Sequence, residues 1–170
     1  GSFTNVSANK LKEWVAGGGQ LIAFGAAIKW LKSNSVIACN YKPFLFKQDT
    51  VKRFENLEND RASVAVSGAI VSARMDLTHP LCYGYTADTL SLFRSDTLVL
   101  EKGKNLYSSP IKYCSTPLLS GYMPRDFAAH LGGQPAVMVH SVGTGRVVSI
   151  SDDAAFRGFW YGTNRLLANA

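Results

Sequence analysis

Hydrophobic residues change their spacing several times along this chain, which divides it into short predicted helices and strands. Near the start, Leu11, Trp14 and Val15 fall on one face of a helix. That helix ends at Gly17-Gly18-Gly19, and the run from Gln20 to Phe24 then predicts a buried strand.

The same alternation continues after this strand. Gly25 turns the chain into a second helix that carries Ile28 and Leu31, and residues 36–40 predict another short strand. Strands that are apolar on both faces and alternate with helices are typical of a parallel sheet covered by helices.

The middle of the chain is more polar. Residues 42–60 are highly charged around Val51, Phe54 and Leu57, and either a surface helix or a long excursion fits them. Residues 69–75 predict a strand that leads into the turn Asp76-Leu77-Thr78-His79-Pro80, and residues 97–100 predict a further short strand.

The last fifty residues carry clearer signals. Pro124 begins a helix through Leu131. Residues 134–142 and 146–151 flank Gly143-Thr144-Gly145, which predicts an antiparallel hairpin. A closing helix places an apolar stripe at helical spacing, formed by Phe156, Phe159, Trp160, Thr163 and Leu167. The pattern as a whole predicts an α/β sandwich with a parallel centre and an antiparallel edge hairpin.

Length and composition fit one folded domain over residues 1–170, of which Gly1-Ser2 looks like the remnant of a tag. Of the residues, 46% are hydrophobic and 18% charged, which argues against disorder. The net charge is +6, but lysines and arginines are scattered singly, so nucleic acid is not an expected partner. No apolar run approaches the roughly 20 residues of a membrane span.

Cysteine and histidine spacing predicts no metal site. Cys39, Cys82 and Cys114 are far apart and form no C-x-x-C, so buried free thiols are favoured; one disulfide with one free thiol stays open for an exported protein. His79, which follows Asp76 and precedes Pro80, is the best histidine candidate for a site, but a hydrogen-bonding cap at the strand end is the favoured interpretation.

The other two histidines have structural interpretations. His130 lies near a helix C-terminus, where a cationic ring suits the dipole, and His140 lies in a strand, where we expect it to be packed.

No nucleophile occupies a reactive position. The sharp strand-to-helix corner Ala23-Phe24-Gly25-Ala26-Ala27 has the small residues of a nucleophile elbow but no Ser or Cys. Cys39 is not followed by a helix start, and Ser120 has a single glycine neighbour and no elbow. Neither glycine-rich turn follows a strand and opens a helix, so no phosphate cradle is predicted.

Acids, arginines and aromatic residues near the C-terminus form the remaining candidate site. They are Asp152, Asp153, Arg157, Trp160, Tyr161 and Arg165. One of the two aspartates is expected to cap the last helix, and the arginines to pair with these acids or with Asp76. The adjacent aromatic side chains diverge, so one can join the core while the other faces a partner. Arginine with aromatic residues is typical of an interface, which favours domain packing over a small-ligand site.

Several of these segments recur in one order in a known group. They are Gly17 to Ile22, Gly68 to Val71, Asp76 to Gly84, Pro117 to Tyr122, Gly143 to Val147 and Asp152 to Leu167. With them the chain resembles the C-terminal domain of large bacterial zinc carboxypeptidases, which are carboxypeptidase A-like metallopeptidases. The resemblance implies a flavodoxin-like, class I glutamine amidotransferase-like fold that follows a peptidase unit. It also implies that the first strands of the complete fold are missing, since the chain opens on the helix before Gly17.

Functional residues do not carry over from that group. The H-x-x-E motif and later His that bind zinc have no matching positions, and Gly25 and Ala26 stand where an amidotransferase has its Cys nucleophile. The resemblance therefore implies a non-catalytic accessory domain without its own cofactor, in a periplasmic or secreted parent whose zinc lies in the peptidase unit. The expected partners are that unit or a second copy of the chain.

Two alternatives from other classes stay open. One is a relic hydrolase or amidotransferase that uses Cys39 or Cys114 with His79. The other is a peptide or small-ligand binding module centred on His79, Ser120 and the helix from Arg157 to Arg165.

Overall fold

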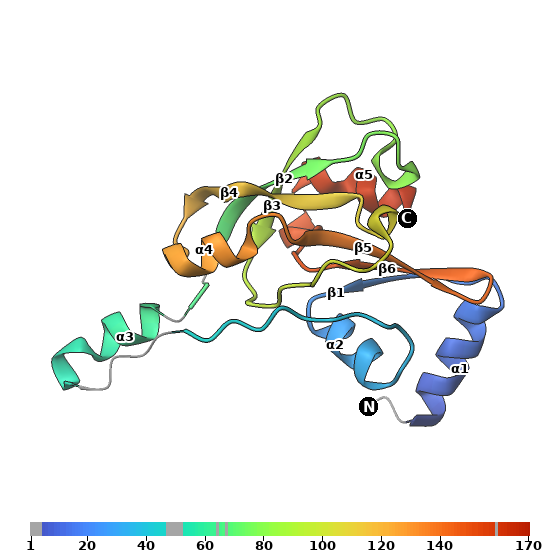
Figure 1. Cartoon of the computed structure of the whole chain (residues 1–170), viewed down its shortest axis with the longest axis horizontal. Coiled ribbons are helices and arrows are strands. Elements are labelled where there is room, and N and C mark those ends of the chain that lie inside the picture. The colour runs from blue at the N-terminus through green and yellow to red at the C-terminus, as the bar shows by residue number, and fades with distance from the viewer. Residues whose placement is uncertain (1–4, 47–52, 64, 67, 159) are drawn as a thin grey trace.

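The computed structural model describes residues 5–46, 53–63, 65–66, 68–158 and 160–170 (Figure 1). The helices are α1 (Asn5–Ala16), α2 (Ala26–Ser33), α3 (Leu57–Ser63), α4 (Arg125–Leu131) and α5 (Tyr161–Asn169). The strands are β1 (Gln20–Phe24), β2 (Ala69–Met75), β3 (Thr89–Arg94), β4 (Ile111–Gly121), β5 (Pro135–Val142) and β6 (Gly145–Ile150).

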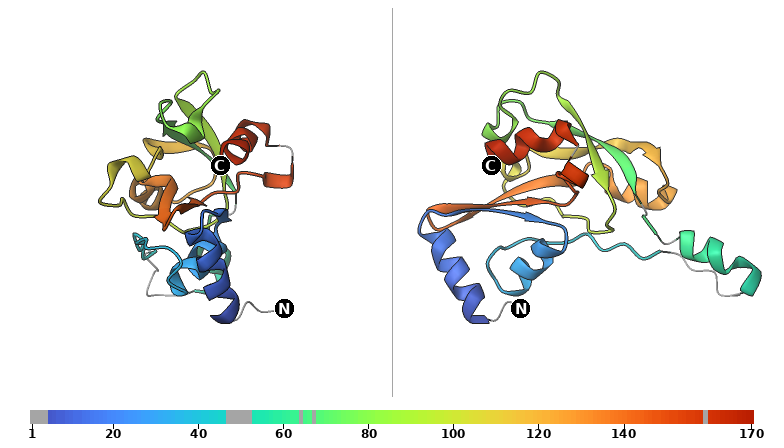
Figure 2. Two further views of the ribbon diagram at one scale, coloured as in Figure 1. Left: turned by 90° about the vertical axis from the view of Figure 1, so that its right-hand side faces the viewer. Right: turned by 180° about the vertical axis from the view of Figure 1, so that it is seen from behind.

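All of these strands belong to one six-stranded sheet, in the order β1-β6-β5-β4-β2-β3. Only β1 and β6 pair in parallel, at one edge of the sheet, and every other neighbouring pair is antiparallel. The sheet is strongly twisted and curled (Figure 2). The predicted flavodoxin-like, class I glutamine amidotransferase-like sandwich with a parallel centre is therefore wrong.

The error has a physical cause in the segment after α2. Residues 36–40 form no strand; Val36, Ile37 and Cys39 are buried in irregular backbone beneath the sheet. An apolar run shows burial but not pairing, and here β1 takes its partner from the other end of the chain. The predicted strand at 97–100 is also absent, apart from a single bridge between Leu100 and Tyr41.

Other elements agree with the hydrophobic pattern. α1, β1, α2, β2 and α4 all form, with Ile28 and Leu31 of α2 buried. β5 and β6 make the expected antiparallel hairpin around the turn at 143–144, but it lies inside the sheet and not at its edge as predicted. The Thr144 backbone N–H and hydroxyl each donate to the Ala16 carbonyl at 3.0 Å, which ties the end of α1 to this turn.

The core lies in two clusters. One packs α1 and α2 onto the β1–β6 pair, through Val15, Ile28 and Val147 among others. The larger cluster packs α4 and α5 against the rest of the sheet, with Phe127 and Leu166 buried at its centre.

An arm leaves this body between α2 and β2. In Figure 1 α3 stands well away from the sheet, at the end of an extended segment. A 3₁₀ turn at Phe54–Asn56 precedes α3, so the charged region contains both a long excursion and a short helix. Leu45 is 89% exposed, Phe54 91% and Leu57 38%. The predicted contribution of Val51 lies outside the described residues.

The closing segment is not one helix. A 3₁₀ turn at Phe156–Gly158 contains a break at Arg157, whose φ is 50°, and α5 starts only at Tyr161. The predicted single helix is therefore wrong, although Thr163 and Leu167 of its stripe do pack inward. Phe159 lies outside the described residues. None of the helices in the described part of the chain has the length and apolar character that a bilayer span requires.

Candidate functional site

Asp152, one of the predicted site residues, belongs to a buried polar network. Arg94 Nη1 donates to Asp152 Oδ1 at 2.9 Å and to the Tyr113 hydroxyl at 2.8 Å, and that hydroxyl donates to Asp152 Oδ2 at 2.6 Å. Arg94 and Asp152 have no exposed side-chain surface. Arg94 Nη2 also donates to the Leu98 carbonyl. Asp152 therefore joins β3, β4 and the segment after β6, and it does not cap a helix.

Burial controls the protonation of this network. Burial raises the pKa of Asp152, and the Arg94 guanidinium opposes that rise. Burial also raises the pKa of Tyr113 well above its ordinary value, so the phenol keeps the proton that it donates. Both Asp152 oxygens are thus occupied by protein donors, which makes this acid a structural group.

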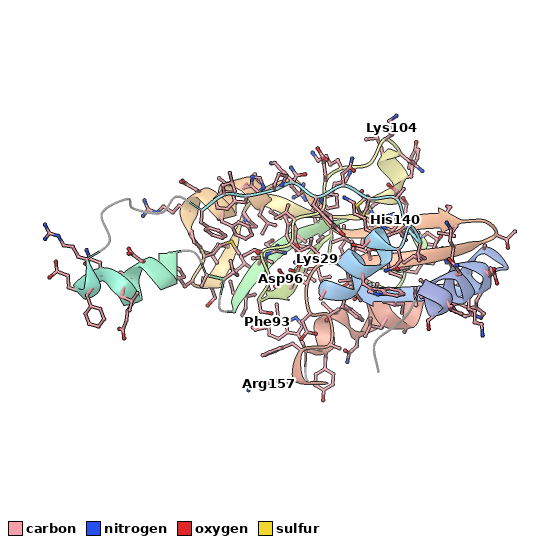
Figure 3. The ribbon with its side chains drawn as sticks, turned by 90° about the horizontal axis from the view of Figure 1, so that it is seen from below. Lys29, Phe93, Asp96, Lys104, His140 and Arg157 are labelled. Atoms are coloured by element: carbon pink, nitrogen blue, oxygen red, sulfur yellow. The ribbon has the colours of Figure 1, made fainter. Side chains whose placement is uncertain are left out.

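The corner after β1 lies next to this network. Gly25 has a φ of 45°, in the left-handed region, and lines a small cavity of about 170 Å³. The cavity is lined by Phe24, Gly25, Ser95, Asp96, Ser151, Asp152 and Asp153. Asp96 Oδ2 lies 3.8 Å from the position of a Gly25 β-carbon, and Asp96 Oδ1 lies 3.9 Å from Lys29 Nζ (Figure 3). The residues that line this corner include neither a thiol nor an imidazole, and the nearest charged group is a carboxylate.

His79 is used as a local cap. Its Nδ1 accepts a hydrogen bond from the Leu81 backbone N–H at 3.2 Å, at the start of a 3₁₀ turn over Pro80–Cys82. Burial lowers its pKa, which favours the neutral ring that such an acceptor needs. His79 thus acts as a hydrogen-bonding cap, but of the 3₁₀ turn and not of the end of β2.

The remaining residues of the C-terminal cluster are dispersed. Asp153 Oδ1 accepts from the Ala155 N–H at 3.1 Å, so neither aspartate caps α5. Trp160 Nε1 donates to the Ser91 carbonyl on edge strand β3 at 3.1 Å, while Tyr161 is 77% exposed. Trp160 thus contacts the sheet while Tyr161 faces solvent, so the two side chains diverge; that Tyr161 faces a partner stays a prediction.

The two arginines do not pair with acids as predicted. Arg165 donates to the Gly84 carbonyl, and its guanidinium lies 5.9 Å from the centre of the Tyr85 ring. The Arg157 guanidinium lies 5.2 Å from the centre of the Phe156 ring, at the periphery of the molecule (Figure 3).

The proposed thiol chemistry finds no support. All three cysteines are free; Cys39 and Cys82 are buried, and Cys114 is half-buried. Burial raises the pKa of Cys39, which disfavours the reactive thiolate. Cys114 Sγ lies 3.2 Å from the Ser72 hydroxyl, and no contact joins a thiol to His79 among the described residues.

Ser120 and the other histidines are also separate from any common site. Ser120 is exposed on β4, opposite Ile70. His140 is buried with its Nε2 3.1 Å from the Ser149 hydroxyl, and His130 lies in the last turn of α4. In the described ranges, no three His, Cys, Asp or Glu residues are placed to hold a metal ion.

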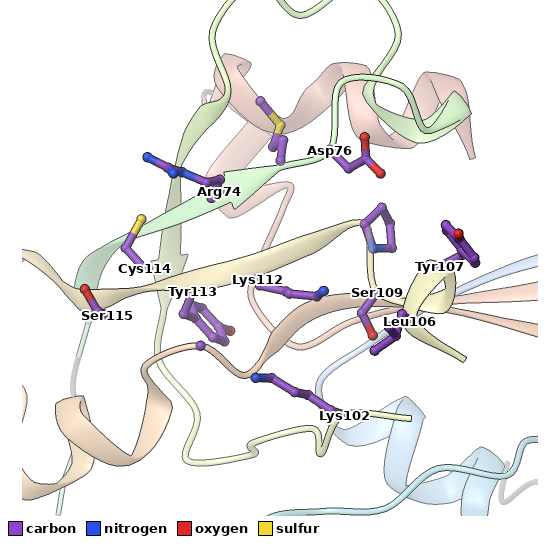
Figure 4. Close-up of a pocket in the computed structure, with 13 residues that line it drawn as sticks. Arg74, Asp76, Lys102, Leu106, Tyr107, Ser109, Lys112, Tyr113, Cys114 and Ser115 are labelled. Carbon is purple, nitrogen blue, oxygen red and sulfur yellow. The ribbon is translucent and has the colours of Figure 1, made fainter. Parts of the chain in front are cut away.

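A larger cleft lies along β2 and β4, and the sequence interpretation did not foresee it. Its volume is about 610 Å³ (Figure 4). It is lined by Arg74, Met75, Asp76, Lys102, Leu106, Tyr107, Ser109, Pro110, Lys112, Tyr113, Cys114, Ser115 and Gly133. Asp76 and Cys114 are the residues among them that the sequence interpretation had considered as site candidates. Lys112 and Cys114 occupy alternate positions of β4, so both can line the same cleft. The sequence would have shown this only if β4 had been recognised as a strand.

Comparison with known proteins gives weak structural similarities alone. No protein-family model matches the chain, and no curated protein matches its sequence. Gan42B, a GH42 beta-galactosidase, aligns over 97% of this chain with 15% identity and a TM-score of 0.44. A beta-galactosidase from Bacillus circulans sp. alkalophilus aligns over 96% with 14% identity and a TM-score of 0.39. The chain spans 20% of each enzyme's length, and similarity this low assigns neither a family nor an activity to it.

Proposed function

We propose that this chain is a non-catalytic accessory domain of a larger protein and that it packs against another part of that protein. The observation that carries the proposal is the fully buried Arg94–Asp152 ion pair at 2.9 Å. It engages an acid of the C-terminal candidate cluster and uses it to hold the C-terminal segment on the sheet. Arg165, Trp160 and His79 likewise make structural hydrogen bonds.

The arm supplies the surface for packing. Phe54 and Leu57 present apolar side chains to solvent on the part of the arm that stands apart from the body. Leu45 is also exposed, but its neighbours Phe44 and Phe46 pack on Phe127 of α4. Exposed apolar side chains gathered on a projecting element mark an interaction site more often than isolated ones do. The proposed occupant of this surface is the zinc carboxypeptidase unit that the sequence resemblance implies, in a periplasmic or secreted parent.

Two tests apply, one to the sequence encoded upstream of this chain in its reading frame and one to the activity of the chain itself. We expect H-x-x-E and a distant His upstream, and we expect the chain alone to release no amino acid from a peptide substrate in the presence of zinc. Robust hydrolysis by the chain alone would refute the non-catalytic assignment. An upstream sequence that lacks those zinc ligands would refute the proposal that the parent protein is a zinc carboxypeptidase.

The arm is tested by expressing the upstream unit and this chain as separate polypeptides and measuring their association by sedimentation. The double variant F54S/L57S should weaken association about tenfold or more, because it removes the exposed apolar side chains. V6S is the matched control, since Val6 is an exposed apolar residue on α1 with 65% exposure. Equal weakening by both variants, or by neither, would contradict docking through the arm.

A further inference from the structure

The cleft along β2 and β4 carries positively charged side chains that no ion pair within the described residues fully neutralises. Arg74 and Lys112 stand directly opposite each other in the antiparallel register of these strands, an arrangement of like charges that is unfavourable. Arg74 Nε has a partner, Asp88 Oδ2, at 3.4 Å. In the described part of the chain, the ammonium groups of Lys112 and Lys102 have neither an ion pair nor a hydrogen bond.

Two further features mark the lysine side of the cleft as a place for a ligand. Ser109 is only 5% exposed, yet its hydroxyl lines the cavity and has no hydrogen bond within the described residues. Lys102 Nζ lies 3.8 Å from the position of a Gly133 β-carbon, so it stands over backbone that carries no side chain. Figure 4 shows Lys102 and Lys112 entering the cleft from two different elements. Two ammonium groups and a hydroxyl around a cavity are suited to a carboxylate.

Asp76 gives the cleft a negative end as well. Its Oδ1 accepts both the Thr78 N–H at 3.0 Å and the Thr78 hydroxyl at 2.6 Å. These hydrogen bonds hold the Asp76 pKa below its ordinary value, so the group is ionised at neutral pH. No described residue donates to Oδ2, which leaves that oxygen free to accept from an ammonium group.

The apolar part of the cleft lies near the same end. Leu106 and Tyr107 are 73% and 83% exposed and line the cavity beside the charged groups (Figure 4). A volume of about 610 Å³ is in the usual range for small-molecule sites.

From this arrangement we propose that the cleft binds a short peptide with free ends, a site that the accessory role does not require. The carboxylate of the peptide binds Lys102 and Lys112, its ammonium group binds Asp76, and an apolar side chain packs on Leu106 and Tyr107. A simple anion leaves Asp76 without a partner, whereas a zwitterion pairs both ends of the cleft.

Isothermal titration calorimetry with glycyl-phenylalanine and its capped forms tests this site. The free dipeptide should bind the chain, and C-terminal amidation or N-terminal acetylation should each weaken binding about fivefold, as expected for loss of one exposed ion pair. In K102M/K112M the free acid and the amide should bind equally. In D76N, which keeps acceptors for Thr78, the free amine and the acetylated form should bind equally.

K104M is the matched control, because Lys104 is an exposed lysine close in sequence that does not line the cleft. It should retain wild-type affinity and both capping effects. Melting curves of all variants establish that they fold. Equal affinity of wild type for free and capped dipeptides, or unchanged affinity in K102M/K112M, would overturn the proposal. Inorganic phosphate binding as tightly as the dipeptide would overturn it too, in favour of a plain anion site.

Discussion

Arg94 needs compensation from all its neighbours because its side chain has no contact with solvent. Asp152, Tyr113 and the Leu98 carbonyl provide that compensation, and Arg94 Nε is the buried side-chain nitrogen or oxygen without a partner among the described residues. Such a pair adds little net stability over an apolar substitute, but breaking it is costly.

Removing either partner should therefore destabilise the fold strongly. R94M leaves the Asp152 carboxylate buried without its cation, and we expect the free energy of unfolding to fall by about 3–5 kcal/mol in urea titrations. D152N should have an effect in the same direction. K29Q is the control: it breaks an exposed pair with Asp96 and should cost less than about 1 kcal/mol. A loss in R94M no larger than in K29Q would contradict the role of the network.

His140 should make stability depend on pH. Burial lowers its pKa below the ordinary 6.5, so the unfolded chain binds a proton at a higher pH than the folded chain does. The free energy of unfolding should therefore fall as the pH drops from about 7.5 to about 5.5, and recover as the pH rises. His79, whose pKa burial also lowers, adds to the same slope.

Urea titrations across that pH range check this prediction with two variants. H140Q should have a shallower slope because it removes the titrating ring. S149A removes the neighbouring hydroxyl but leaves the imidazole, so it should keep the wild-type slope. An unchanged slope in H140Q would assign the pH dependence to other groups.

Residues of the network also show what sequence could foresee at this scale. Asp152 was selected as a candidate, but Arg94 and Tyr113 were not. Arg94 and Asp152 are 58 residues apart, so nothing in local spacing links them. The capping role of His79 is easier to foresee because its partner, Leu81, lies two residues away.

At the level of elements, α1 and the β5–β6 hairpin pack without space for a side chain. A methyl group on Gly145 would overlap the carbonyl oxygens of Val15 and Gly19. These oxygens belong to the end of α1 and the turn into β1, so Gly145 sets how closely the helix approaches the sheet.

G145A should consequently separate α1 from the hairpin. We expect a loss of about 1–3 kcal/mol in unfolding free energy, typical of overpacking, with faster amide hydrogen exchange in α1. G162A is the matched control, because a β-carbon there meets nothing within 4 Å and the site lies in α5. It should be neutral or stabilising, by up to about 1 kcal/mol. An unchanged free energy of unfolding in G145A would contradict this prediction, because it would show that α1 can move away from the hairpin at no cost.

Prediction at this scale succeeded where an element and its partner are close in sequence. The hairpin was found from its turn, whereas β3 and β4 were missed. β3 does alternate buried and exposed positions, with Leu90 and Leu92 buried. β4 contains Pro117 and has two register shifts against β2, which disturb the alternation that would have revealed it.

For the whole molecule, the arm should be the first place that a protease attacks. Arg53 lies at the base of the 3₁₀ turn before α3, with its side chain 71% exposed. Limited trypsin digestion should cut at or near Arg53 before any site in the body. The two fragments should stay associated in size-exclusion chromatography, because β1 from one pairs with β6 from the other. Initial cleavage within the sheet, or separation of the fragments, would contradict this description.

The overall architecture could not be predicted because it depends on one distant pairing. The pattern at residues 20–40 is that of a parallel α/β unit, and local reasoning extended it to a parallel centre. In the structure that unit stops after α2, and β1 completes an otherwise antiparallel sheet. The cleft along β2 and β4 was missed for the same reason, since it is made by strands that the pattern did not separate.

The edge pairing of β1 with β6 also bears on how the chain is made. Gln20 and its partner Arg146 are 126 residues apart, so on a ribosome β1 has no strand to join until β6 has emerged. Closing so long a loop is entropically costly and slows folding. During that interval β1 has no paired neighbour, and an unpaired strand edge in a partly made chain is prone to aggregate.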